Sequence, residues 1–584
     1  MKLRSLLSCL CLFWSAAAVN AASLDRTAFT FTKYDLAVRI EPGQQRLGVR
    51  GKVTLRNDSS APQKVALLQI SSSLGWRSVA SRGTPLQFVS QPYTSDIDHT
   101  GALSECVISL PEAIAPKNSI DLEIAYEGVI LLDATRLTRI GTPEPTAKNT
   151  DWDQISPKFT AVRGVGYVTW YPIATEDVSL SDGESLSDTL GEWKSREAAS
   201  SMHLQITVQG DEDSEAPEVL LNASSCPTAH QVGRDFVADC MYQASGSAVP
   251  TFVIANYESV DRSDIAVHFL RGHDAAAMNY ADASEKVAPF INEWFGRPRG
   301  KAQTADLIDP GAGPFESGSF LLTPLANSDA KLAGLVAAHQ LTHAALSSPR
   351  PWIDEGLAHF AQALYLESQS GRQVALDYIG RHRSSLSTAE GEKHNPDTAS
   401  RSDDAVNQSL VNTAREELDR SKAMCVWWML RDMVGDSILK KAIASYHPEQ
   451  DKDPSYMPRL IQAQTQHDLE WFFDDWVYRD RGLPDFKVAS AFTRKTLPEG
   501  YMLTVTVDNL GAAGAEVPLL VKFAGGEVSK RLVVRGKSNG VIRVEVPKPP
   551  QEIVVNDGSV PESDTTNNTF KINNTDPSNS PNKP

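Results

Sequence analysis

Two histidines four residues apart, His339 and His343, have the residue type and spacing of metal ligands. They lie in a segment of helical periodicity, where that spacing puts both imidazoles on one face, one turn apart. Glu355, near the start of the next predicted helix, could complete a set of two histidines and one carboxylate. Zinc is the natural metal for such ligands, with a fourth position open to water. We therefore expect these three side chains to bind one Zn²⁺ ion.

The alternative for these residues is that they are ordinary members of two helices. A pair of histidines four apart is weak evidence by itself, but the segment Trp352-Ile-Asp-Glu355-Gly that follows at short range makes the pattern more specific. His359 lies one turn after Glu355 on the same predicted face. It could form a hydrogen bond that orients one of the metal ligands, or it could be a structural histidine.

Gln340, next to His339, occupies a position that matters for catalysis. Zinc peptidases of the His-Glu-x-x-His type use that glutamate as the general base. A glutamine has nearly the same shape but no titratable group, so it cannot accept the proton. The loss of proton transfer typically costs about two to four orders of magnitude in rate. Asp354 and Glu316 are the nearest carboxylates that could substitute for the missing base.

The elements that must position these residues change character along the chain. A chain of 584 residues is too long for one core, and segments 28–257 and 484–560 show the alternation typical of antiparallel β-sandwiches. Segment 258–483 is mostly helical by periodicity. Segments 177–200 and 384–407 are predicted to be exposed loops, and the polar tail 561–584 is predicted to be disordered.

The N-terminus predicts export. Residues 1–21 combine Lys2 and Arg4 with a short apolar run and small residues before a cleavage point after Ala21, which is typical of a signal peptide. No later run is long enough to cross a membrane, so we expect a periplasmic or secreted protein. The net charge of −17, without a basic cluster, argues against a nucleic-acid partner.

Four cysteines remain after the predicted signal peptide. Cys226 and Cys240 flank a predicted hairpin, and an oxidising compartment would allow a disulfide between them, although two buried thiols are an equal alternative. Cys425 lies in an apolar helical run and is expected to be a buried thiol. The spacings suit no cysteine-based zinc site.

Taken with the order of its segments, the chain resembles the aminopeptidase-N family, which includes leukotriene-A hydrolase. The segment His339 to His343 and the run Glu355-Gly-Leu-Ala match that family's zinc motif, although the eleven residues between His343 and Glu355 are fewer than the family usually has. The resemblance implies an N-terminal β-sandwich, a thermolysin-like α+β peptidase domain and a small C-terminal β-sandwich. It covers nearly the whole chain after the signal peptide.

Two further segments resemble family motifs. Gly313-Pro-Phe-Glu316-Ser is similar to the segment that binds the substrate's free amine, so the resemblance implies that Glu316 meets an ammonium group. Arg420 stands where the family has the tyrosine that stabilises the oxyanion, and its reach and geometry differ from those of a tyrosine. Arg420 could also be a solvated residue on a helix face.

Gln340 and Arg420 are two separate departures from the family pattern. They favour a zinc-binding protein that binds peptides or a partner protein and is catalytically impaired. The alternative is an active aminopeptidase with a substitute base, because the three ligands and Glu316 are all present. A metal-free structural scaffold is the third hypothesis.

Overall fold

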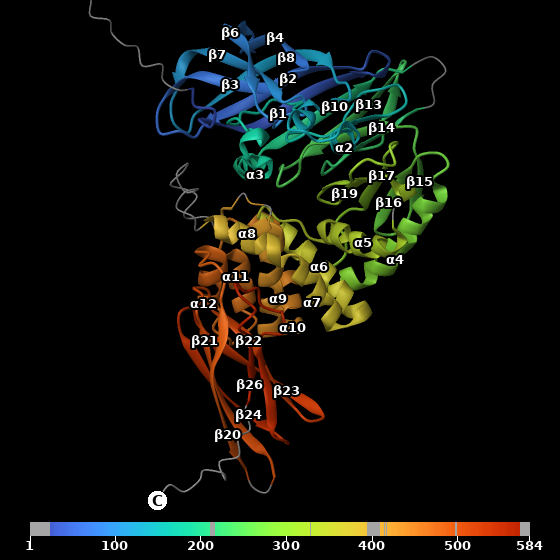
Figure 1. Cartoon of the computed structure of the whole chain (residues 1–584). Helices are drawn as coiled ribbons and strands as arrows, with labels where there is room; N and C mark the ends of the chain where they lie inside the picture. Colours follow the sequence, from blue (N-terminus) through green and yellow to red (C-terminus); the bar gives the residue numbers. More distant parts are fainter. Residues whose placement is uncertain are drawn as a thin grey trace, which may run out of the picture.

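The computed structural model describes residues 24–210, 216–327, 329–393, 409–413, 415, 417–496 and 499–572. Figure 1 shows strands of the N-terminal third at one end, a layer of helices in the middle and strands of the C-terminal part at the other end. The protein is thus a multidomain α+β chain. The predicted signal peptide, residues 1–21, lies outside the described residues.

An eight-stranded sheet forms the N-terminal end, in the order β12-β13-β10-β1-β2-β8-β4-β5. Strand β1 pairs antiparallel with β2 and parallel with β10. Alternate residues of β1, such as Leu36, Val38 and Ile40, are buried, because successive side chains point to opposite faces. The bounds are β1 (Phe29–Glu41), β2 (Arg46–Asn57), β4 (Leu74–Ser81), β5 (Thr84–Pro85), β8 (Ser119–Val129), β10 (Ser201–Val208), β12 (His230–Val232) and β13 (Asp235–Tyr242).

Two three-stranded sheets, β3-β7-β6 and β11-β14-β9, complete this end. Their buried residues, among them Leu68, Ile108 and Val253, belong to the same apolar core as those of β1. The bounds are β3 (Gln63–Ser71), β6 (Phe88–Thr94), β7 (Ala102–Ile114), β9 (Thr160–Val162), β11 (Glu218–Leu221) and β14 (Phe252–Ala255), with helical segments η1 (Pro42–Gln44), α1 (Thr135–Arg139), α2 (Glu144–Thr150) and η2 (Leu180–Asp182).

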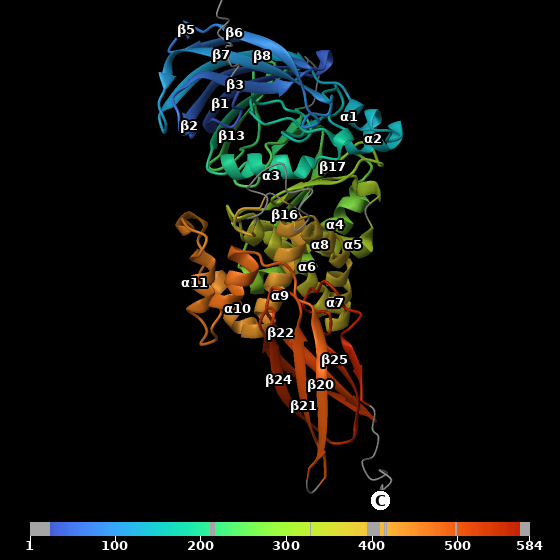
Figure 2. The same ribbon diagram turned by 60° about the vertical axis from the view of Figure 1, so that its left-hand side comes forward.

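The segment 177–200, predicted to be an exposed loop, instead contains helix α3 (Leu186–Glu197). Its first turn is capped by Ser185, whose hydroxyl accepts a hydrogen bond from the backbone of Asp188. Trp193 is buried and packs edge-on against Phe31, with ring centroids 5.4 Å apart. Figure 2 shows α3 on the side of the N-terminal strands that faces the helices. The polar composition of this segment had suggested a loop, but the segment forms a helix with one buried face.

A five-stranded sheet, β15-β16-β17-β19-β18, joins the N-terminal strands to the helices. Its short strand β18 lies at the edge and pairs only with β19. The bounds are β15 (Glu258–Asp261), β16 (Ile265–Phe269), β17 (Ala302–Asp306), β18 (Phe315–Ser317) and β19 (Phe320–Thr323).

Apart from β17, β18 and β19, the elements described between residues 274 and 478 are helices. Helices α4, α5, α6 and α9 share one apolar core with the C-terminal strands. The predicted loop 384–407 begins as helix α8, and its residues 394–407 lie outside the described part. The bounds are α4 (Asp274–Phe295), η3 (Leu325–Asn327), α5 (Ala330–Ala345), α6 (Pro351–Ser370), α7 (Arg372–Arg381), α8 (Arg383–Lys393), η6 (Leu418–Lys422), α9 (Ala423–Val434), α10 (Asp436–Ala444), η7 (Pro448–Gln450), α11 (Tyr456–Gln462), α12 (Glu470–Phe473) and η8 (Asp474–Tyr478).

Two facing sheets, β20-β21-β24 and β23-β22-β25-β26, form the C-terminal end. The tail predicted to be disordered from Pro561 instead contributes Glu562, which is 1 % exposed, and strand β26, which pairs with β25. Residues 573–584 lie outside the described part. The bounds are β20 (Phe486–Lys495), β21 (Tyr501–Asn509), β22 (Ala515–Phe523), β23 (Gly526–Val534), β24 (Asn539–Val546), β25 (Pro550–Val555) and β26 (Thr569–Lys571).

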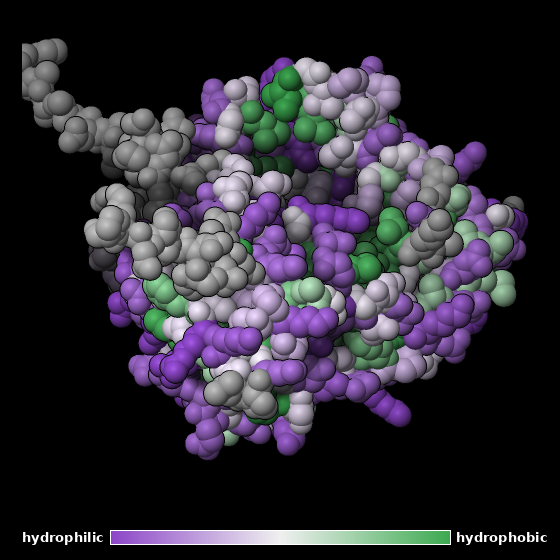
Figure 3. All heavy atoms as spheres, turned by 60° about the horizontal axis from the view of Figure 1, so that its bottom comes forward, coloured by the Kyte–Doolittle hydropathy of each residue, from purple (hydrophilic) through white to green (hydrophobic). Residues whose placement is uncertain are grey.

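The described cysteines divide into one bonded pair and two thiols. Cys226 and Cys240 form a disulfide, whereas Cys106 and Cys425 are buried and free. Figure 3 shows a face on which hydrophilic residues predominate. Among the described residues, no helix is both long and apolar enough to cross a membrane.

A buried lysine connects three separate segments near the centre of the molecule. Lys422, at the end of the π-helical turn η6, is completely buried and forms ion pairs with Glu390 of α8 and Asp480 after η8. Its ammonium group also lies 5.6 Å from the centroid of the Trp476 ring. Because η6 also carries Arg420, this network fixes the backbone that leads to the predicted site.

Replacement of Lys422 by methionine should strongly destabilise the protein. It would leave two carboxylates buried without their cation, and breaking a buried pair typically costs about 3–5 kcal/mol. The free energy of unfolding, measured by chemical denaturation of the whole chain, would show the loss. The control is Lys522→Met, which removes a surface ion pair with Glu552 and should change little. Equal effects of the two substitutions would contradict the burial argument.

Candidate metal centre

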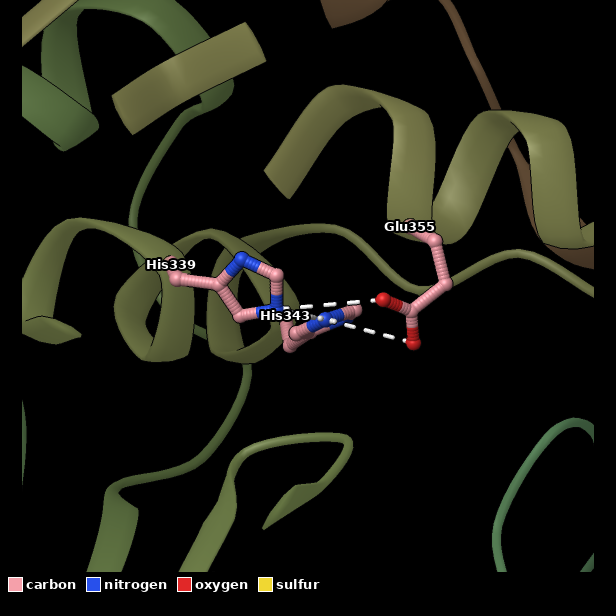
Figure 4. A group of neighbouring side chains, drawn as sticks. All are labelled: His339, His343 and Glu355. Atoms are coloured by element: carbon pink, nitrogen blue, oxygen red, sulfur yellow. Dashed lines mark hydrogen bonds and ion pairs between the residues drawn. The ribbon is translucent and has the colours of Figure 1, made fainter. Parts of the chain in front are cut away.

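Helices α5 and α6 bring the three predicted ligands together. One ligand atom each from His339, His343 and Glu355 lies within 4.8 Å of the others. The two histidine Nε2 atoms are 3.2 Å apart, and the carboxylate oxygens of Glu355 lie 3.8 Å from His339 and 3.9 Å from His343. Figure 4 shows the imidazoles on one helix directed toward the carboxylate on the other.

The local sequence explains how Glu355 reaches the histidines. Pro351 begins α6 only a few residues after α5 ends, and proline is favoured at a first helical position because its missing N–H has no helical partner there. Gly356 lets α6 pack closely on α9, since a Cβ atom at this position would lie 2.6 Å from the Cβ of Ala423. The short connection and the close packing together place the first turns of α6 over the histidine face of α5.

The donor set fits zinc. Two imidazole nitrogens and a carboxylate oxygen converge from a nearly rigid helix pair, and their chemistry is that of a tetrahedral zinc site. Burial opposes the ionisation of Glu355, but the charges of His343 and Arg420 lower the pKa of its carboxyl group. Glu355 is therefore present as the carboxylate that a metal ion requires.

Asp354 lies behind His343 and holds its ring. Its carboxylate is 3.6 Å from Nδ1 of His343, on the opposite side of the ring from the Nε2 that faces Glu355. It also accepts hydrogen bonds from the backbone of Ser348 at 2.8 Å and from the hydroxyl of Ser247 at 3.0 Å. A carboxylate in this position orients a histidine ligand and raises its basicity. Asp354 is therefore placed to position His343, and not to act as the substitute base.

Gln340 is completely buried, and its side chain is turned into the sheet. Its amide nitrogen donates to the carbonyl oxygens of Gln303 at 2.8 Å and Ser319 at 3.0 Å. Its amide oxygen accepts from the hydroxyls of Tyr280 at 2.9 Å and Thr304 at 3.2 Å. Both donor hydrogens are used, which a carboxylate could not reproduce because it has only acceptors when ionised. Gln340 therefore ties α5 to strand β17, to the turn before β19 and to helix α4.

Glu316 faces the metal centre from the edge strand β18. Its Oε2 atom lies 3.7 Å from Nε2 of His339, and burial raises the pKa of its carboxyl group to about 8. The N-terminal part of the chain holds this strand on both sides. Asn149 and Trp152 bind the backbone of Gly313, and Asn222 donates to the hydroxyl of Ser317. Gly313 thus contributes its backbone, where a Cβ atom would lie 3.3 Å from the carbonyl oxygen of Asn149.

Arg420 approaches from the other side. Its Nε atom lies 3.6 Å from Oε2 of Glu355, and its side chain is 46 % exposed. It projects from η6, and such π-helical turns occur frequently at functional sites. Its pairing with Glu355 distinguishes it from a solvated surface residue.

His359 lies beside His339, with ring centroids 4.7 Å apart. Burial lowers its pKa to about 4, so its ring is neutral at physiological pH. Neither of its ring nitrogens has a hydrogen-bond partner among the described residues.

A cavity of about 1010 Å³ opens beside this group. Gln340 is not among its lining residues, and α3 forms much of the opposite wall. The segment that forms this wall was predicted to be a loop, although Leu186, Leu190 and Trp193 recur at helical spacing after the Ser185 cap. The lining includes Tyr167, Leu186, Leu190, Lys194, Ser247, Tyr280, Phe315, Glu316, Leu321, Leu332, Val336, His339, Glu355, His359 and Arg420.

No family model and no curated protein matches this chain. The solved structures that resemble it include three of one enzyme. They are an M1 zinc metallopeptidase from Deinococcus radiodurans (TM-score 0.47, 14 % identity), a mutant of that enzyme (TM-score 0.45, 14 % identity) and the mutant bound to a Tyr-Ser-Ala substrate (TM-score 0.46, 15 % identity). Each alignment covers 79 % of this chain and 96 % of the other.

Replacement of Asp354 by asparagine should weaken zinc binding about 10- to 100-fold, because His343 would lose the carboxylate that orients it. Competition with a chelating dye would measure the affinity. Asp377→Asn, at an exposed position on α7, is the matched control and should leave the affinity unchanged. An unchanged affinity in Asp354→Asn would show that His343 needs no such support.

Replacement of Gln340 by glutamate should destabilise the protein increasingly as the pH rises. Only the protonated acid can donate to one of the two backbone carbonyls, so the fold raises the pKa of the new carboxyl group above its unfolded value of about 4.3. The variant is then most stable, relative to the original chain, below that value, and it loses stability up to the raised pKa. The loss near pH 8 should be about 3–5 kcal/mol. Denaturation curves at pH 5 and pH 8 test this, with exposed Gln464→Glu as the control.

Proposed function

We propose that this protein is an exported, zinc-binding protein of the aminopeptidase-N type that binds the N-terminal end of peptides and is impaired in hydrolysis. The observation that carries the proposal is the placement of Gln340. Its amide nitrogen donates both hydrogens to backbone carbonyls of the sheet region, and Gln340 lies outside the cavity lining. The three predicted ligands, His339, His343 and Glu355, are all present beside it. The base position on the zinc helix thus lacks both the chemistry and the direction that proton transfer requires.

His339, His343 and Glu355 would hold the zinc ion, with Asp354 orienting His343. A zinc ion held by these three ligands alone would supply a Lewis acid that polarises a carbonyl oxygen and lowers the pKa of a water molecule. Glu316 would bind the ammonium group of a peptide, because a cation beside it would lower the raised pKa of its buried carboxyl group and favour the carboxylate. The hydrophobic residues of α3 and α5 along the cavity, such as Leu190 and Val336, would then contact the peptide side chains.

The predicted signal peptide and the net charge of the chain support the proposed location and the proposed kind of partner. The predicted signal peptide would direct the protein to the periplasm or the extracellular space, where the Cys226–Cys240 disulfide can persist. The partner would be a peptide or the free N-terminus of another protein. A nucleic acid is not proposed, because the net charge is −17.

A second candidate is an active aminopeptidase that uses Glu316 as its base. The distance of 3.7 Å between Glu316 and Nε2 of His339 favours this alternative, since Glu316 is the carboxylate in the cavity closest to the ligands apart from Glu355 itself. One carboxylate would then have to bind the amine and accept the proton. The first proposal assigns Glu316 only the amine.

Peptide binding and hydrolysis can be measured on the same zinc-loaded protein. Aminoacyl reporter substrates should show no turnover above that of His339→Ala, while peptides with a free N-terminus should bind. Acetylation of the peptide, or Glu316→Gln, should weaken binding about 10- to 100-fold, because a charge-assisted contact is lost. Glu285→Gln, at an exposed position on α4, is the matched control.

Two results would contradict the proposal. Turnover that disappears in His339→Ala and in Glu316→Gln would establish the aminopeptidase instead. Equal affinity for free and acetylated peptides would remove the assigned role of Glu316.

A further inference from the structure

His359 occupies a position that the three-ligand site does not explain. It follows Glu355 by one helical turn on α6, so both side chains lie on one face of the helix. Its ring packs on His339 at a centroid distance of 4.7 Å, with the planes inclined by 70°. His343 packs on the same ring at 4.9 Å and 68°. Two imidazoles thus lie at similar distance and inclination from the ring of His339.

The nitrogens of His359 are unusual because both are buried and neither has a hydrogen-bond partner among the described residues. Buried polar atoms are nearly always bonded, and an exception calls for a missing ion or water. The neighbouring histidines differ in this respect. Asp354 supports His343, and Nδ1 of His382 lies 3.1 Å from the hydroxyl of Ser421. Nδ1 of His339 also lacks a partner, but its Nε2 lies beside His343 and Glu355. Of these four histidines as the structure describes them, only His359 has no partner on either nitrogen, and it lines the cavity.

The ring separations match shared coordination. Two imidazoles on one tetrahedral zinc ion, with bonds of about 2.0–2.1 Å, have ring centroids about 5 Å apart. The nitrogens of His359 lie outside the group of ligand atoms found within 4.8 Å of one another. A rotation of the side chain would be needed to bring one of them to the metal, and it would break no hydrogen bond, because His359 makes none among the described residues.

We propose that His359 is the fourth protein ligand of the zinc ion, so that three imidazoles and one carboxylate close the site. This inference rests on the proposal that His339, His343 and Glu355 bind zinc. A site with four protein ligands has the character of a structural zinc site, whereas a catalytic site keeps one position open. Zinc would then fix α5 and α6 relative to each other and shape the cavity next to Glu316.

Zinc-edge X-ray absorption spectroscopy of the whole zinc-loaded protein tests the proposal, because it counts the imidazoles around the ion. We expect three imidazoles in the original chain, two in His359→Gln, and three in the control His382→Gln. The zinc affinity of His359→Gln, measured with a chelating dye, should fall more than about tenfold. The cobalt-substituted original chain should also keep its visible spectrum when azide is added, since no position is free for it.

Two imidazoles in the original chain, or a cobalt spectrum that changes with azide, would overturn the closed site. Zinc binding by His339, His343 and Glu355 would stand in that case. A protein that binds no zinc would overturn the proposed function itself and this inference with it. The measurements on the original chain decide the question even if His359→Gln fails to fold.

Discussion

The buried amide of Gln340 determines how the metal-binding helix faces the cavity. It joins α5 to two backbone carbonyls and to two hydroxyl groups on other elements, so α5 cannot rotate without leaving buried polar groups unpaired. With this rotation fixed, His339 and His343 can only face α6. The residue at the proposed general-base position therefore fixes the direction of the proposed ligands, which is why a change to glutamate cannot be treated as a simple repair.

The second constraint comes from the N-terminal strands, which form part of the site. They hold the edge strand β18 through Gly313 and Ser317, contribute Ser247 to the support of Asp354, and cover the cavity with α3. These contacts hold the backbone just before β18 and the side chain of Ser317 at its end. The position of Glu316 relative to His339 therefore depends on contacts between segments far apart in the chain.

The sequence predicted that His339, His343 and Glu355 lie together, because helical spacing and a short connection are local properties, and the structure brings their ligand atoms within 4.8 Å of one another. It could not show where Gln340 points or what Asp354 contacts, since both depend on the packing of α5 against a sheet and on Ser348. Helix α3 was wrongly predicted as a loop because its Ser, Asp and Glu residues conceal an apolar stripe that only a partner surface reveals. Strand β26 was wrongly included in a disordered tail because three residues are too few to show a pattern.

The charges at the candidate metal centre indicate how the proposed site would bind both a cation and an amine. The histidine nitrogens and the guanidinium group of Arg420 both lie close to the carboxylate oxygens of Glu355. A zinc ion would take one oxygen and leave Arg420 near the other, which keeps a positive charge at this wall of the cavity. Glu316 would then be the main negative group beside the metal. A peptide amine would bind at Glu316, and the first carbonyl oxygen of the peptide would face the positive side of the cavity. The arrangement of charges across the cavity would therefore orient the bound peptide.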